Sequence, residues 1–157
     1  MRPHKLLPAL LPPRAPLAAP GKPAGADSGR SASGCIPLAR EGVAWIVLTN
    51  RNHVRAADVV RTLTGAPVLI HAADETYARA QGATIDGAVR AAQRIGPFIV
   101  VALPGKSPGE VALHWPDRRL LVVGDAVIGN PPGRLSLLPD RVVDDPPGLR
   151  RSVTGLV

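Results

Sequence analysis

Two short apolar runs that flank a helix-forming segment limit the possible folds more than any other feature of this sequence. Residues 43–48 are apolar throughout, which suits a strand buried on both faces, and residues 68–70 form a second such run. Asn50 or Asn52 can cap a helix between them, and the Gly-Ala-Pro of residues 65–67 ends it. A strand, a helix and a strand in this order predict a right-handed parallel unit and an α/β fold.

The next segments predict a helix followed by a group of strands. Residues 72–81 indicate a short helix with acidic residues in its first turn, where the helix dipole favours them. Residues 98–103 are a strong strand segment. Residues 110–115 and 120–123 are two further apolar runs, and the four residues 116–119 between them are typical of a hairpin turn.

The N-terminal segment differs in composition from the rest of the chain. Residues 1–41 hold eight of the eighteen prolines and show neither helix nor strand periodicity, which predicts a disordered tail and a folded domain over residues 42–157. The tail carries six Lys/Arg against two acids, and the remainder carries thirteen against ten. Because the remainder has no basic cluster with stacking aromatics, we do not expect a nucleic-acid binder.

Cysteine content and hydropathy limit location and redox chemistry. Cys35 is the only cysteine, so neither an intrachain disulfide nor a thiolate metal cluster can form. No apolar run approaches the roughly 18–20 residues that a transmembrane helix needs. Prolines interrupt the basic and apolar start of the chain, so a targeting signal within residues 1–25 is the weaker alternative. We therefore expect a cytoplasmic protein without a membrane partner.

Two glycine-containing loops beside apolar strands are the candidate site. The first is Pro104-Gly-Lys106-Ser-Pro-Gly-Glu110, and the second is Gly124-Asp125 after the hairpin. Glycine gives the backbone freedom in such loops, and polar side chains held there tend to form sites rather than cores.

Both loops, with one earlier segment, resemble motifs of the metallo-β-lactamase family. Trp45-Ile-Val-Leu-Thr49 followed by Asn50-Arg-Asn-His-Val-Arg55 is similar to that family's strand ending in Leu-Thr and its His-x-His-x-Asp-His motif. Residues 104–110, the hairpin and Gly124-Asp125 resemble the family's Pro-Gly-His-Ser-Pro-Gly-Ser, hairpin and Gly-Asp. The order and spacing agree over roughly residues 42–140, and the second block is the more specific.

The resemblance implies that most metal-ligand positions carry side chains that do not bind zinc. The first two His positions fall on Asn50 and Asn52, the Asp on Val54, the third His on Arg55, and the His of the Pro-Gly motif on Lys106. Only Asp125, at the position of the metal-bridging carboxylate, is retained. One carboxylate cannot hold a catalytic zinc, so we expect no cofactor and no catalytic residue; zinc or iron is expected only with atypical ligands.

The same substitutions suggest a different chemistry for the site. A buried carboxylate without a cation is costly, and we hypothesise that Lys106 and Arg55 pair with Asp125 in place of the metal. A relocated metal site that uses His53, His71 and His114 is a weaker alternative, because their spacing does not preorganise ligands. The candidate anion-binding residues are therefore Asn50, Asn52, Arg55, Lys106 and Asp125.

The resemblance implies a partial metallo-β-lactamase-like αββα sandwich, a mixed sheet assembly with flanking helices, truncated at both ends. An incomplete sandwich leaves sheet edges open, which favours a homo-oligomer or a complementary chain. Three functions follow as hypotheses. The first is a hydrolase-family protein with a degenerate metal site, non-catalytic or binding a small anion. The second is an active hydrolase with atypical ligands, and the third is an interaction protein that uses the tail.

Overall fold

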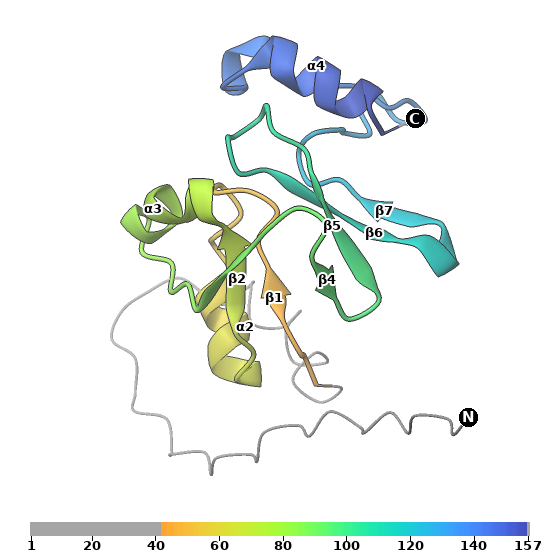
Figure 1. Ribbon diagram of the computed structural model, residues 1–157. Helices are drawn as coiled ribbons and strands as arrows, with labels where there is room; N and C mark the ends of the chain where they lie inside the picture. The colour runs from red at the N-terminus through yellow and green to blue at the C-terminus, as the bar shows by residue number, and fades with distance from the viewer. Residues whose placement is uncertain (1–41, 157) are drawn as a thin grey trace, which may run out of the picture.

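The computed structural model describes residues 42–156, so the predicted tail over residues 1–41 lies outside the described residues. The part described contains two sheets that face each other, with helices on both outer sides (Figure 1). The helices and strands, in chain order, have the following bounds: β1 Ile46–Val47, α2 Ala57–Thr64, β2 Val68–His71, α3 Ala72–Ala80, β3 Gly87–Val89, β4 Arg94–Ile95, β5 Phe98–Ala102, β6 Val111–Trp115, β7 Leu120–Val122 and α4 Pro146–Thr154. Short 3-10 helices occupy Pro116–Arg118 and Asp140–Val142.

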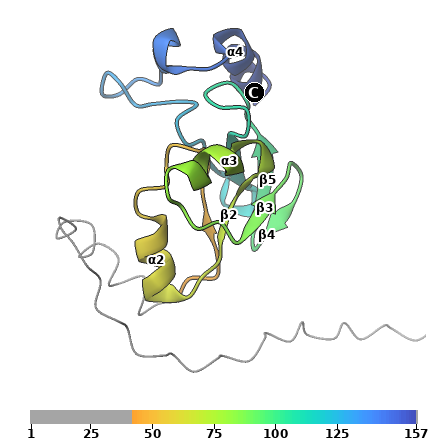
Figure 2. The same ribbon diagram turned by 90° about the vertical axis from the view of Figure 1, so that its left-hand side faces the viewer.

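The first sheet is parallel and has the order β1-β2-β3. Its existence confirms the predicted strand–helix–strand unit, and α3 confirms the second predicted helix. Residues 82–94, between the predicted helix and the next predicted strand, contribute β3 and the start of β4. Figure 2 shows α2 and α3 together on one face of this sheet.

The second sheet is antiparallel and has the order β4-β5-β6-β7. The predicted hairpin is confirmed by the pairing of His114 with Leu121 in β6 and β7. β7 forms one edge of this sheet, and its Leu120 and Val122 stay exposed. The prediction that a second chain covers an open edge remains a prediction.

Alternating side chains build three apolar layers and explain why the elements stack in this way. In β2, Val68 and Ile70 face α2 and α3, whereas Leu69 faces the second sheet. In β5 and β6 the inward residues, such as Val100, meet the first sheet, and the outward ones, such as Ala112, meet α4. The layer order is therefore helices, parallel sheet, antiparallel sheet, helix, as the predicted αββα sandwich requires.

The sequence after Asp125 is rich in Gly and Pro and indicates only the start of a helix toward Val157, whereas the structure has the whole helix α4 at Pro146–Thr154. Asp145 caps this helix by accepting a hydrogen bond from the Gly148 N–H at 3.0 Å, and Pro146 takes its first position. Leu149 is fully buried against the second sheet. Among residues 42–156, no helix has the length and apolar character needed to cross a membrane.

Candidate functional site

Three loops meet at one end of the sandwich, and backbone contacts hold them there. The Val111 N–H donates to the Thr49 carbonyl at 2.8 Å, which joins the loop after β1 to the loop before β6. The loop after β7 approaches both: a Cβ added at Gly124 would lie 2.7 Å from Thr49 Oγ1 and 3.3 Å from Glu110 Oε1. Gly124 also has a φ of +58°, so glycine is required here by space and by conformation.

Asp74, in the first turn of α3, holds the 104–110 loop in place. Its carboxylate is completely buried and accepts three hydrogen bonds: from Ser107 Oγ at 2.5 Å, from the Gly109 N–H at 3.0 Å and from the Arg51 N–H at 3.0 Å. The first turn of α3 therefore clamps two of the three site loops. The sequence indicated only a helix-dipole role for Asp74, since its spacing says nothing about these distant donors.

The amide of Asn50 occupies the centre of the site. Asn50 is fully buried, and its Nδ2 lies 3.3 Å from Glu110 Oε1 and 3.3 Å from Asp125 Oδ2, so one neutral group donates to two carboxylates. Its Oδ1 accepts from the Asn52 N–H at 2.9 Å. The expectation that Asn50 or Asn52 caps the following helix is wrong, because α2 begins at Ala57 without a side-chain cap.

Asp125 is paired differently from our hypothesis. Its Oδ1 lies 3.1 Å from His53 Nε2, and the other ring nitrogen of His53 lies 3.1 Å from Thr49 Oγ1. Among residues 42–156, neither Lys106 nor Arg55 forms a salt bridge with Asp125. The predicted pairing is therefore wrong. The two donors that reach Asp125 come from the segment directly after β1, which the backbone contact at Thr49 brings close.

Arg55 and Asn52 lie together beside the network around Asp125 and not within it. With His53 and Ala56 they line an open hollow of about 400 Å³. Through His53 this hollow adjoins the hydrogen-bonded network around Asp125. Two of the five predicted anion-binding residues thus share the hollow, and two others, Asn50 and Asp125, contact each other.

Lys106, the fifth, lies on the 104–110 loop and is 7% exposed. No residue among 42–156 forms a salt bridge with it. Ser107, its neighbour, donates its hydroxyl to Asp74, so this side chain stabilises the loop.

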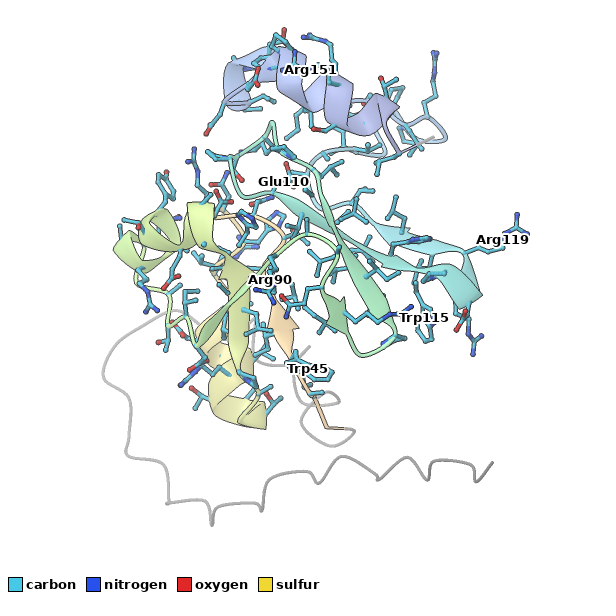
Figure 3. The ribbon with its side chains drawn as sticks, viewed as in Figure 1. Trp45, Arg90, Glu110, Trp115, Arg119 and Arg151 are labelled. Atoms are coloured by element: carbon cyan, nitrogen blue, oxygen red, sulfur yellow. The ribbon has the colours of Figure 1, made fainter. Side chains whose placement is uncertain are left out.

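Glu110 is the site residue that sequence reasoning missed (Figure 3). It is 1% exposed, and Oε1 accepts from Asn50 Nδ2 and, at 3.1 Å, from the Asp125 N–H. Burial raises the pKa of Glu110, and the two hydrogen bonds and the Lys106 charge lower it by a smaller amount. The resulting pKa is about 7. The available signal was its place in the motif, where a carboxylate stands instead of the family's final Ser.

The donor set does not fit the metal that the resemblance implies. Within residues 42–156, no group of three or more His, Cys, Asp or Glu side chains could hold a metal ion. His71 caps α3 and His114 lies in β6, so the relocated three-histidine site is not formed. At the centre, the Asn50 amide presents N–H donors to both carboxylates, whereas a metal would need lone pairs there.

Comparisons with known proteins agree on the family. The model of the metallo-beta-lactamase superfamily matches residues 38–156. Among solved structures, BLEG-1 B3 metallo-beta-lactamase is 25% identical with a TM-score of 0.62, over 82% of this chain and 71% of that one. TTHA1623, solved in a di-iron-bound form, is 30% identical with a TM-score of 0.54, over 71% of this chain.

The match to TTHA1623 covers 62% of that protein, so this chain spans less than two thirds of its length. No curated protein sequence matches this chain. The family model covers most of this sequence, and both solved structures are similar to this chain in fold. The chain belongs to the metallo-β-lactamase superfamily.

Proposed function

We propose that this chain is a metallo-β-lactamase-superfamily protein with a degenerate metal site, which carries out no metal-dependent hydrolysis and binds a small anion instead. The observation that carries the proposal is the position of Asn50. Its amide lies within hydrogen-bond distance of both Glu110 and Asp125, at the place where the family pattern puts an imidazole. A neutral donor that two carboxylates share takes over part of the task of a cation.

The anion-binding part rests on the cations around this network. Lys106 is largely buried and has no ionic partner among residues 42–156, and Arg55 has none there either while it lines the hollow beside His53. Cations whose charge is not matched by a carboxylate are available to an anionic ligand.

Metal analysis tests the first part of the proposal. The purified chain is incubated with zinc, iron(II) or manganese, dialysed and analysed for bound metal and for ester hydrolysis. We expect less than about a tenth of an equivalent of metal and no metal-dependent rate, because a single retained ligand position binds weakly. One equivalent of tightly held metal in the unmodified chain would overturn the proposal.

A matched control makes a negative result informative. Asn50→His, Asn52→His, Val54→Asp, Arg55→His and Lys106→His together restore five of the ligand positions that the family pattern implies, on the same backbone. We expect this variant to retain metal after dialysis while its circular dichroism stays native-like. Equal metal content in both chains would show that the ligand positions are assigned wrongly.

A further inference from the structure

The few aromatic residues of this chain gather on one apolar surface. The sequence contains two Trp, one Phe and one Tyr. Trp45 and Phe98 line one hollow of about 210 Å³, and the Phe98 ring meets the Trp115 ring edge-on with centroids 5.4 Å apart. Every side chain that lines the hollow is apolar. Trp45 and Trp115 lie on the same side of the molecule (Figure 3).

This apolar surface continues across the hairpin of β6 and β7. Leu113, which also lines the hollow, pairs with Val122, and Trp115 pairs with Leu120. Residues directly opposite each other in antiparallel strands share one face of the sheet. Trp45, Leu120 and Val122 are 47%, 45% and 41% exposed. We call this set the aromatic surface, and its members are Trp45, Phe98, Leu113, Trp115, Leu120 and Val122.

The aromatic surface is open because the two sheets differ in width. Among residues 42–156, β1 pairs with β2 alone, so the parallel sheet ends at β1 after three strands, whereas the antiparallel sheet has four. Leu120 and Val122 share a face with Leu113, which packs against the parallel sheet, yet they stay exposed. A continuous exposed apolar surface of this kind marks a site of interaction.

The segment that enters the domain at Gly42 can reach this surface. Its nearest apolar stretch is Ile36-Pro37-Leu38, and the six residues 36–41 span up to about 20 Å when extended. Trp45, three residues after Gly42, already lines the hollow. Proline restricts the residue before it to extended backbone, and extended segments that contain proline dock on grooves lined by aromatic rings.

Tethering favours this segment over a second copy of the chain. A short flexible linker holds a segment at an effective concentration of about a millimolar. A second copy has to offset the loss of its translational and rotational freedom when it associates. The occupant that fits best is therefore covalently attached to the surface.

We propose that Ile36-Pro37-Leu38 docks on the aromatic surface of its own chain. In a strand-like conformation the side chains of Ile36 and Leu38 point to the same face, so both are buried against the surface, and Pro37 keeps the segment extended. The inference concerns residues 36–38 and leaves the rest of the predicted disordered tail unchanged. It uses none of the candidate anion-binding residues and is independent of the proposed function.

Acrylamide quenching of tryptophan fluorescence tests the inference on the full chain, because both tryptophans lie on the aromatic surface. Ile36→Ser combined with Leu38→Ser should raise the quenching constant at least about twofold, since the rings lose their cover. Leu10→Ser combined with Leu11→Ser removes two apolar side chains from the same Pro-rich segment and should match the unmodified chain. Equal quenching of all three proteins, or an equal rise in both variants, would overturn the inference.

Dilution distinguishes the two occupants. Protection of the tryptophans by the chain's own segment is intramolecular, so it should stay constant when the protein is diluted about a hundredfold. Protection that is lost on dilution would show that a second copy covers the surface, which overturns the inference.

Cys35 gives an independent measurement, because it is the only cysteine and directly precedes Ile36. Pro97→Cys places a thiol at the hollow, and Leu63→Cys places one at an exposed position of α2 as a control. Under mild oxidation, Pro97→Cys should form an intrachain disulfide with Cys35 at least about tenfold faster than Leu63→Cys. Equal rates would overturn the inference. If Pro97→Cys does not fold, the quenching comparison decides alone.

Discussion

Replacing Glu110 by Gln tests the electrostatics of the site without ligands. The change keeps the size of the side chain, and the amide oxygen can still accept from Asn50 Nδ2 and from the Asp125 N–H. It removes the ability to ionise and replaces the other carboxyl oxygen by an amide NH2 group, an effect that does not depend on pH. Any difference in pH dependence between the two proteins then reports on this one buried carboxyl.

The size and sign of the effect follow from the pKa of Glu110. Burial raises it from 4.5 to about 7 in the folded protein, so the folded state binds the proton more tightly than the unfolded state. The resulting stability is fully present below about pH 4.5 and is lost as the pH rises through about 7. A shift of this size corresponds to about 3 kcal/mol, of which about 2.5 kcal/mol disappears between pH 5 and pH 8.

Urea unfolding followed by circular dichroism at pH 5, 6, 7 and 8 measures this directly. The free energy of unfolding of the unmodified chain should fall by about 2.5 kcal/mol more than that of Glu110→Gln over this range, and the variant should be the more stable one at pH 8. All other titrating groups are shared and cancel in the difference. Parallel pH profiles for the two proteins would show that Glu110 does not titrate in this range and would refute the reasoning.

Two further substitutions test how the loops are held. A Cβ at Gly105 would lie 2.4 Å from the Leu149 Cα, and the residue has a φ of +149°. Gly105→Ala should therefore lower the free energy of unfolding by about 3 kcal/mol. The control is Gly129→Ala, where a Cβ would meet nothing within 4 Å, and it should change the free energy of unfolding by less than about 0.5 kcal/mol. Thermal or urea unfolding of both variants checks this, and equal effects would contradict the close packing. Asp74→Asn replaces one carboxylate oxygen by an amide donor that faces the donors now bound there, and it should lower the free energy of unfolding by about 3 kcal/mol. The control is Asp58→Asn, because Asp58 accepts from the Thr84 N–H at an exposed site, and it should lower the free energy by under about 1 kcal/mol in the same assay. A smaller loss of stability at Asp74 than at Asp58 would show that Asp74 does not hold the loops.

The sequence predicted those strands whose residues form one continuous apolar run. The runs at 68–70 and 98–103 are continuous apolar segments, and both form strands, β2 and β5. By contrast, β1 comprises only Ile46–Val47, although residues 43–48 are all apolar, because pairing partners exist for two residues alone. Helix α4 is harder to predict because proline pairs are typical of loops, yet here Asp145 is the N-cap and Pro146 takes the first helical position.

For the candidate site, the positions of the residues could be predicted from the sequence, whereas their contacts could not. Carrying the family motifs over, residue by residue, identified Asn50, Lys106 and Asp125 as positions of interest, and all three lie on the three loops that meet. The pairing of Asp125 could not be predicted, since it depends on the 3.1 Å approach of His53 from a loop 72 residues earlier in the chain. A motif gives positions, whereas partners depend on packing that no local pattern records.

The substitutions at the metal-ligand positions are better explained as a replacement than as decay. Simple loss of ligands would leave the half-buried Asp125 without a side-chain donor, yet Asn50 and His53 both reach it. The chain also adds a carboxylate, Glu110, which burial destabilises by roughly the 3 kcal/mol derived above, and leaves Lys106 without an ionic partner among residues 42–156. Stability alone would favour apolar residues at both places. Local rules are broken in this way mostly where a chain binds something, and this is the physical reason to look for a ligand at this end of the sandwich.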